Sequence, residues 1–190
     1  MENTGMISDL LREAEMKMKK SVEATRHEFT LIRTGRANPA ILEHVMVNYY
    51  GTELPLNQVA SITVPDPRQI LITPFDKNAL PAIEKGILKS DVNLTPNNDG
   101  TAIRLNIPPL TEERRKELIK LLHKKAELGH AAIRNIRHEC NNHIRALTKN
   151  KECSEDEEKR ALEKVQKLTD QYIAEIDAAT KQKEQELLEV

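Results

Sequence analysis

The chain has 190 residues, of which 31% are charged and 38% hydrophobic, and its net charge is −1. Such a composition is typical of a soluble protein with one large domain or two small ones. Aromatic residues make up 3% and tryptophan is absent, which argues against an aromatic stacking platform for single-stranded nucleic acid. No apolar run reaches the roughly 18 residues of a membrane span, and the polar Met1–Gly5 lacks the features of a secretory signal. We therefore expect a cytoplasmic protein that does not contact a membrane.

The first predicted element is a long amphipathic helix from about Ile7 to Arg33. Apolar or small residues recur there at spacings of three and four, which defines one buried helical face. These residues are Ile7, Leu11, Ala14, Met18, Val22, Thr25, Phe29 and Ile32.

The segment Asn38–Ile107 has a different character, because it holds seven of the nine prolines. Runs rich in β-branched and aromatic residues, separated by turn residues, predict several strands and one helix. With few basic residues, this small β/α/β sandwich is not an obvious reader of nucleic acid. The predicted strands are Glu43–Tyr50, Ala60–Val64, Gln69–Thr73 and Ala102–Ile107, the helix is Leu80–Leu88, and Pro96–Gly100 is a loop.

Helical periodicity resumes after Pro108 and Pro109. Thr111 is a good N-cap and is followed by Glu112 and Glu113, which favour a helix N-terminus. The helix would have about 38 residues and a length of roughly 55 Å. Its apolar residues are Leu118, Leu122, Ala126, Gly129, Ile133, Ile136, Cys140, Ile144 and Leu147. Gly129 costs about 1 kcal/mol relative to alanine, so we expect it to allow a close helix–helix approach.

A third helix follows a short turn at Asn150–Cys153. Ser154 and Glu157 form a capping-box pattern, and the apolar track is Ala161, Val165, Leu168, Tyr172, Ile176 and Ala179. The predicted fold class is therefore α+β, an elongated three-helix bundle that carries a small inserted domain. The predicted division is 1–33 with 111–190 for the bundle, 38–107 for the insert, and 34–37 and 108–110 for two hinge linkers.

Charge is distributed unevenly between the last two helices. Residues 111–151 have eleven Lys and Arg against five Asp and Glu (+6), whereas residues 154–190 have six against eleven (−5). A basic stripe should lie on the surface beside the apolar track, and such a block suits a polyanion partner. The alternative is a solvated face that pairs with the acidic third helix. The stripe comprises Lys116, Lys120, His123, His130, Arg134, Arg137, Asn141 and Arg145, with Glu127 as its only acid.

The sequence contains no recognisable catalytic or cofactor-binding motif. Its six glycines are scattered and form no phosphate-binding loop. His138 and His143 are five residues apart, about 140° around a helix, and so do not share the face that a metalloprotease motif needs. Cys140 lies in a helix and Cys153 beyond its end, too far apart for a disulfide. We expect no enzyme activity, no metal and no cofactor.

Five motifs in order resemble bacterial ribosome recycling factors over about Met6–Leu188. They are Ile32–Ala37, Tyr49–Thr52, Pro96–Gly100, Pro108–Arg115 and Ile133–Arg137. The resemblance implies an L-shaped, tRNA-like molecule that binds large-subunit ribosomal RNA and, with elongation factor G and GTP, splits post-termination ribosomes. His138 departs from the family pattern, because a second arginine is common there.

The resemblance and the stripe together define the candidate residues. The RNA-binding candidates are Arg134, Arg137, Asn141, Arg145, His130, Lys116, Lys120, Arg115, Arg33 and Arg36. The hinge candidates are Thr34, Gly35, Arg36, Ala37, Pro108, Pro109 and Leu110. We expect a monomer that does not bind DNA. The alternative function is a coiled-coil adaptor that binds only proteins, which would require an apolar seam left over after the bundle closes.

Overall fold

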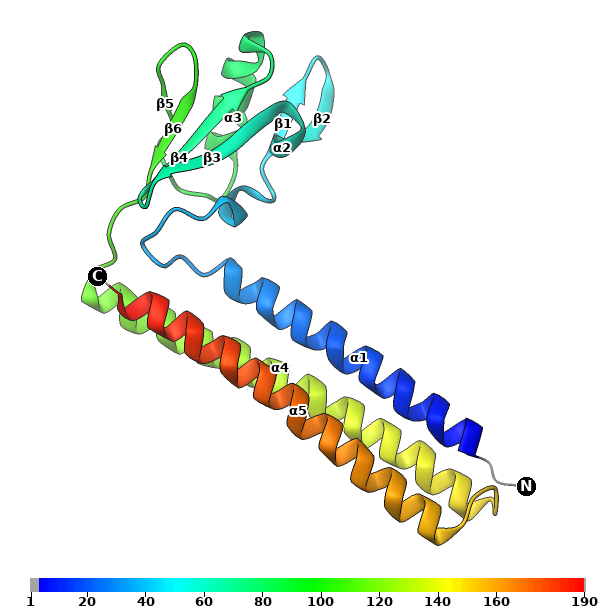
Figure 1. The fold of residues 1–190 in the computed structure, drawn as a ribbon. Coiled ribbons are helices and arrows are strands. Elements are labelled where there is room, and N and C mark those ends of the chain that lie inside the picture. Colours follow the sequence, from blue (N-terminus) through cyan, green and yellow to red (C-terminus); the bar gives the residue numbers. More distant parts are fainter. Residues whose placement is uncertain (1–3, 190) are drawn as a thin grey trace. The chain divides into compact units, whose positions relative to one another are not determined.

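The computed structural model describes residues 4–189 (Figure 1). These form two compact units, one of Thr30–Leu118 and one of the described residues up to Phe29 together with those from Ile119 onward. The chain therefore passes between the units at Phe29–Thr30 and at Leu118–Ile119. The predicted linkers 34–37 and 108–110 lie within the Thr30–Leu118 unit. None of the described helices has both the length and the apolar composition needed to cross a membrane.

Three long helices, α1 (Thr4–Thr30), α4 (Glu112–Lys149) and α5 (Glu155–Leu188), supply the helical unit (Figure 1). This confirms the predicted bundle. One of its core clusters draws residues from all three helices, namely Ile7, Ala14, Cys140, Ile144, Leu147, Ala161 and Val165. The helices approach closely at Gly129, where an added Cβ would lie 2.7 Å from Thr25 Oγ1 and 3.1 Å from Ile176 Cδ1. Close approach is therefore the role of Gly129.

The predicted bundle pattern needs two corrections. Helix α1 ends at Thr30 and not at Arg33, because the Asn38 side chain donates to the Thr30 carbonyl at 3.0 Å and satisfies a carbonyl at the helix end. In α5, Leu168 and Ala179 are half-buried, while the core runs through Thr169, Lys183 and Leu187. Thr169 fits there because its hydroxyl donates to the Val165 carbonyl.

The predicted caps of α4 and α5 are confirmed. Thr111 Oγ1 accepts a hydrogen bond from the Arg114 amide at 3.0 Å. Ser154 Oγ accepts from the Glu157 amide at 3.1 Å, and the Glu157 carboxylate accepts in return from the Ser154 amide. These contacts begin the two helices at Glu112 and Glu155.

The Thr30–Leu118 unit contains two antiparallel sheets, two short helices and two 3-10 turns. One sheet pairs β1 with β2, and the other has the strand order β3-β4-β6-β5. The elements are η1 (Pro39–Leu42), β1 (Met46–Tyr49), β2 (Thr52–Pro55), α2 (Leu56–Val59), β3 (Ala60–Asp66), β4 (Gln69–Pro74), η2 (Lys77–Ala79), α3 (Leu80–Lys89), β5 (Asn97–Asn98) and β6 (Ile103–Asn106).

Alternation along the strands places the core of this unit on one face of the larger sheet. Ile70 and Ile72 of β4 and Ile103 and Leu105 of β6 are fully buried, as the two-residue period of a strand requires. Helix α3 lies so close to β1 that a Cβ on Gly86 would be 2.5 Å from the Met46 carbonyl oxygen. Glycine is therefore required at this contact.

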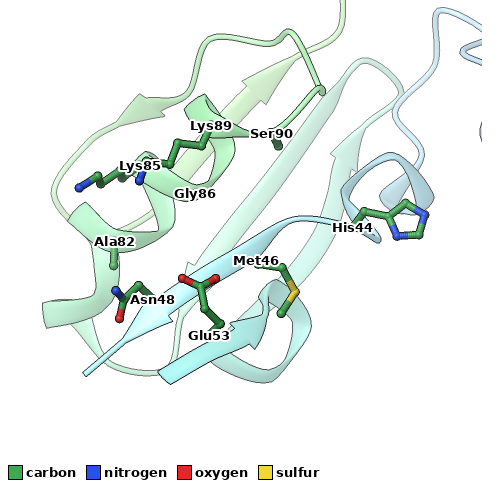
Figure 2. Close-up of a pocket in the computed structure, with 9 residues that line it drawn as sticks. All are labelled: His44, Met46, Asn48, Glu53, Ala82, Lys85, Gly86, Lys89 and Ser90. Carbon is green, nitrogen blue, oxygen red and sulfur yellow. The ribbon is translucent and has the colours of Figure 1, made fainter. Parts of the chain in front are cut away.

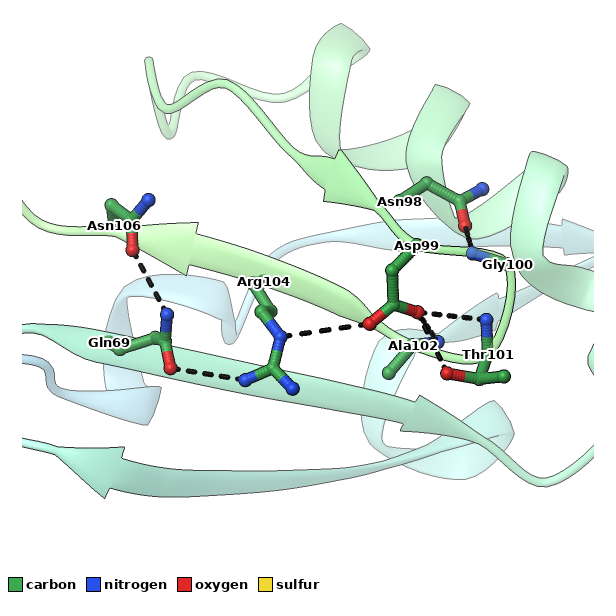
Figure 3. A network of polar contacts seen from close by, with 8 residues as sticks. All are labelled: Gln69, Asn98, Asp99, Gly100, Thr101, Ala102, Arg104 and Asn106. Atoms are coloured by element: carbon green, nitrogen blue, oxygen red, sulfur yellow. Dashed lines mark hydrogen bonds and ion pairs between the residues drawn. The ribbon is translucent and has the colours of Figure 1, made fainter.

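The opposite face carries a polar network (Figure 3). Asp99 accepts hydrogen bonds from the Thr101 and Ala102 amides and the Thr101 hydroxyl, which lower its pKa to about 2. Arg104 lies 3.7 Å from Asp99 and donates to Gln69 at 3.2 Å. The loop before β6 is thus tied to the neighbouring strands.

Several details of the insert differ from the sequence prediction. The expected strand Glu43–Tyr50 begins only at Met46, because Asn38 caps the 3-10 turn η1 and the Val45 amide bonds to the Leu42 carbonyl. The strands β2 and β5 and the helical turns α2, η1 and η2 were not predicted. Each is two to four residues long, too short to show a hydrophobic period.

Candidate nucleic-acid interface

Three exposed residues of the basic stripe on α4 have no intramolecular polar partner among the described residues. Lys120, Arg134 and Arg145 are exposed, and within residues 4–189 none of them forms an ion pair or a side-chain hydrogen bond. At 100° per residue they lie within about 40° of one another around the helix. Their charged groups are therefore available to an external anion along most of α4.

The other part of the stripe pairs with α5. His130 Nε2 lies 2.7 Å from Asp177 Oδ1, and the His130 side chain is only 13% exposed. His123 Nε2 lies 3.6 Å from Glu184 Oε2. The stripe is consequently not the continuous surface that the spacing predicts, because α5 covers its inner edge. For these two histidines the alternative prediction holds, because they pair with acidic residues of α5.

Arg137 lies between these two groups. It is half-buried, and its Nη1 donates to Gln166 Oε1 of α5 at 3.4 Å. This single long bond to a neutral amide leaves most of the guanidinium donors available. Arg137 therefore has a packing contact with α5 as well as capacity to bind an anion.

The remaining stripe candidates differ in their environments. Lys116 is exposed and lies 3.8 Å from Glu112, one turn earlier. Asn141 and Arg115 are half-buried, and the Asn141 Oδ1 and Arg115 Nε atoms are buried without a hydrogen-bond partner. The exposed Lys124 and His138 lie on the same outer face as Lys120 and Arg134 but outside the predicted stripe. Lys124 follows Lys120 by four residues and His138 follows Arg134 by four. This spacing places each pair on one helical face and could have identified Lys124 and His138 from the sequence.

The two predicted linkers run beside each other. Gly35 has φ +77°, and an added Cβ would lie 3.3 Å from Leu110 Cγ and 3.4 Å from the Leu110 amide nitrogen. Only glycine combines this backbone conformation with such a close approach. The sequence predicts a linker at Gly35, but not its contact with the second linker.

Both linkers are anchored to the β3–β4 turn. The Ala37 amide donates to the Pro67 carbonyl at 2.6 Å, and the Ile107 amide donates to the Arg68 carbonyl at 2.8 Å. Asp66 Oδ1 shapes this turn by accepting from the Arg68 amide at 3.0 Å. Among the other linker residues, Thr34 is half-buried, whereas Pro108 and Pro109 are exposed.

Arg33 and Arg36 occupy different positions near these linkers. Arg33 is half-buried and lines a cavity of about 210 Å³ together with Asp91 and His44. Within the described part of the chain Arg33 has no hydrogen bond or ion pair. Arg36 is exposed. Neither arginine belongs to the basic face of α4.

A larger groove of about 440 Å³ lies between α3 and the β1–β2 hairpin (Figure 2). Lys85 and Lys89 project from α3, and Glu53 projects from β2 on the other side. Among the described residues, no cluster of three or more His, Cys, Asp or Glu is arranged to hold a metal ion. Cys140 and Cys153 are both free, and burial raises the pKa of the Cys140 thiol.

Comparison with known proteins assigns the chain to a family. The family model described as ribosome recycling factor matches residues 25–188. The chain belongs to the ribosome recycling factor family. It is 56% identical to the ribosome-recycling factor of Hahella chejuensis and 55% identical to that of Carboxydothermus hydrogenoformans, in each case over 97% of this chain and 100% of the relative.

Two solved structures are also similar. A solution structure of a ribosome recycling factor has a TM-score of 0.80 and 47% identity, with 97% of this chain and 98% of that chain covered. The other describes models for the T. thermophilus ribosome recycling factor and the E. coli elongation factor G bound to the E. coli post-termination complex. It has a TM-score of 0.66 and 49% identity, with 96% and 99% covered.

Proposed function

We propose that this chain binds the post-termination ribosome and, together with elongation factor G and GTP, separates it into subunits for reuse. In this proposal it acts as a cytoplasmic monomer that binds and transmits movement, without catalysing a reaction itself. Membership of the ribosome recycling factor family supports the assignment. So does the similarity to a factor described as bound, with elongation factor G, to a post-termination complex.

The observation that carries RNA binding is the set of unpartnered cations on α4. Lys120, Arg134 and Arg145 have no intramolecular ion pair within residues 4–189, although acidic residues are abundant in the chain. Arginine can form two parallel hydrogen bonds to phosphate oxygens. We propose that these residues and Arg137 bind large-subunit ribosomal RNA, with Lys116, Asn141 and Arg115 at the edges of the contact.

The first experiment measures ribosome binding as a function of salt. Each phosphate contact displaces condensed counterions, so the affinity should fall steeply as the salt concentration rises. Co-sedimentation with isolated large subunits between about 50 and 200 mM salt measures this slope. Replacing both Arg134 and Arg145 by alanine should lower the affinity and make the slope shallower. An affinity independent of salt would contradict the proposed RNA contact.

Function is tested separately by light scattering. Ribosomes incubated with the chain, elongation factor G and GTP should lose scattering as the subunits part, whereas omission of any one component should prevent the loss. A chain that binds ribosomes in co-sedimentation yet never splits them would contradict the recycling function and leave RNA binding intact.

The second candidate function is a protein-binding adaptor. The observation in its favour is that Leu121 and Leu128, one heptad apart on α4, are 40% and 65% exposed. Two leucines do not form the sustained seam that a coiled-coil partner needs over three or more heptads. Replacing both by glutamine should leave ribosome binding and splitting unchanged if the recycling assignment holds.

A further inference from the structure

Two of the five aromatic residues, Tyr49 and Tyr50, lie at the end of the β1–β2 hairpin, and a third, Phe75, precedes the aspartate that they contact. Phe29 and Tyr172 are buried, whereas Tyr50 is 75% exposed and Phe75 is 71% exposed. Tyr49 and Tyr50 pack edge to face with ring centroids 4.5 Å apart. We call Tyr49, Tyr50, Phe75 and Asp76 the aromatic tip. Exposed aromatic groups of this kind are typical of sites that bind other proteins.

The rings are held in place by one carboxylate. The hydroxyls of Tyr49 and Tyr50 donate to Asp76 Oδ2 at 3.1 and 3.2 Å. The other oxygen, Asp76 Oδ1, accepts from the Asn78 amide at 2.9 Å. Asp76 thus holds two tyrosines that are 26 and 27 residues away in the chain, although most of the surface of Tyr50 remains in solvent. The exposed Phe75 directly precedes Asp76.

The backbone under Tyr50 is unfavourable for a tyrosine. Tyr50 has φ +49° and Gly51 has φ +86°, and these two residues form the turn between β1 and β2. Two-residue turns with positive φ at both positions favour Asn, Asp and Gly, because a larger side chain clashes with the backbone in this region. Tyr50 thus adopts a backbone conformation that is unfavourable for tyrosine, and its side chain is not buried in return. Such a combination points to a functional role for the side chain.

We propose that the aromatic tip is a docking point for an arginine side chain presented by a protein partner. A guanidinium can pair with the Asp76 carboxylate while its flat face lies on the exposed ring of Tyr50, since aromatic faces attract cations. Among the common side chains, arginine combines a permanent charge with a planar group that stacks.

The charge of the tip favours a protein partner over RNA. Asp76 places a carboxylate where a stacked base would bring its phosphate, and the only cation adjacent to it in the sequence is the exposed Lys77. The tip also lies in the unit Thr30–Leu118, whereas Arg134 and Arg145 belong to the helical unit. The inference therefore does not depend on RNA binding by α4.

The direct test is an NMR titration of the full-length chain with capped tripeptides. The aromatic signals are few, because the chain has three tyrosines and two phenylalanines. The ring signals of Tyr50 and Phe75 should shift on addition of Ac-Gly-Arg-Gly-amide. The affinity obtained from these shifts should be at least about threefold higher than the affinity for Ac-Gly-Gln-Gly-amide. The variant Asp76→Asn keeps the shape and should lose this preference. Equal affinities for the two peptides, or a preference retained in Asp76→Asn, would overturn the proposal.

Hexauridylate RNA serves as the competing probe in the same titration. Ring shifts at Tyr50 and Phe75 that are larger with hexauridylate than with the arginine peptide would also overturn the proposal, since the tip would then be a base-stacking site. Ring signals of Tyr50 and Phe75 that do not move with hexauridylate would support it.

The variant Tyr50→Asn separates binding from structure. Asparagine tolerates positive φ, so the melting temperature of the full-length protein should rise by about 2–4 °C, while the response to the arginine peptide is lost. A lower melting temperature would show that Tyr50 has a structural role and would overturn the inference. The control Tyr172→Phe should leave the peptide response unchanged.

Discussion

Tyr172 shows how one buried polar group connects two helices. Its side chain on α5 is 3% exposed, and its hydroxyl donates to Glu15 Oε1 of α1 at 2.8 Å. Burial and this hydrogen bond raise the pKa of Tyr172 to about 12. Because both effects favour the neutral phenol, the group contributes to stability only while it is protonated.

This environment gives the bundle a defined alkaline limit. Since the folded pKa lies above the unfolded value of about 10, the contribution is fully present below pH 10 and is lost as the pH rises through 12. Tyr172→Phe should cost about 1 kcal/mol at neutral pH. The difference in free energy of unfolding between the two proteins, measured by urea denaturation, should shrink from pH 10 to 12. A difference that stays constant over this range would contradict the assigned hydrogen bond.

Arg134 and Arg137 are three residues apart but should respond differently to substitution. Arg134→Ala should weaken large-subunit binding by roughly 1.5–3 kcal/mol and change stability by less than about 0.5 kcal/mol, because Arg134 is exposed and unpartnered among the described residues. Arg137→Ala should weaken binding similarly and also destabilise the bundle by roughly 0.5–1 kcal/mol, because its contact with Gln166 is lost.

Co-sedimentation and thermal denaturation measure these two effects. Arg12→Ala removes the same charge from an exposed site on α1, where its one ion pair within residues 4–189 is with Asp9 at 4.0 Å, and should leave both measurements unchanged. A loss of ribosome affinity in Arg12→Ala as large as that in Arg134→Ala would show that net charge alone, and not the face of α4, determines binding.

At the scale of the element, the long helices are amphipathic but their contacts depend on a few small residues. Gly129 is unfavourable within a helix when considered alone. In the bundle it lies against Thr25 of α1 and Ile176 of α5, at distances that leave no space for a Cβ. Tertiary packing therefore reverses the preference that helix propensity would give at this position.

Gly129→Ala tests this reversal. Propensity alone would stabilise α4 by about 1 kcal/mol, whereas the clash with Thr25 Oγ1 should destabilise the bundle by about 1–3 kcal/mol, which thermal or urea denaturation measures. Adding Thr25→Ala removes the clashing atoms and should recover part of the loss, despite the lost Thr25 hydrogen bond to Ser21. If Gly129→Ala alone proved more stable than the wild type, the close approach would not hold.

At the scale of the whole molecule, the chain reaches and leaves the small sheets through two connections that touch. The Gly35–Leu110 contact and the bonds from Ala37 and Ile107 to the β3–β4 turn join the connections to one point. Pro108 and Pro109 add fixed φ values. We propose that this joint transmits force during recycling, because a doubly connected joint with restricted backbone resists twisting more than a single strand does.

Replacing Pro108 and Pro109 by glycine tests the joint. The backbone becomes free to rotate, so ribosome binding should persist while subunit splitting, followed by light scattering with elongation factor G and GTP, becomes slower. A matched control replaces the exposed Pro65 of β3 by glycine. It should split ribosomes at the normal rate. Full splitting activity in the double-glycine variant would rule out a stiff joint as part of the mechanism.

The amino-acid sequence by itself determined the long elements and the starts of α4 and α5. Helices of 27 to 38 residues repeat their apolar period many times, so the signal is strong, and the caps at Thr111 and Ser154 are local interactions. The five motifs were specific enough to indicate the family. The short strands β2 and β5 were missed because a segment of two to four residues cannot show a period.

Only the tertiary structure decided which cations on α4 are available. His130 and Arg134 are alike in sequence pattern, one helical turn apart, yet one meets Asp177 and the other meets solvent. That difference depends on where α5 lies, and its acidic residues are 47 positions away in the chain. Likewise, the hydrogen bond from Tyr50 to Asp76 joins segments 26 residues apart. Local periodicity carries no information about such contacts, because they form only when separate elements pack together.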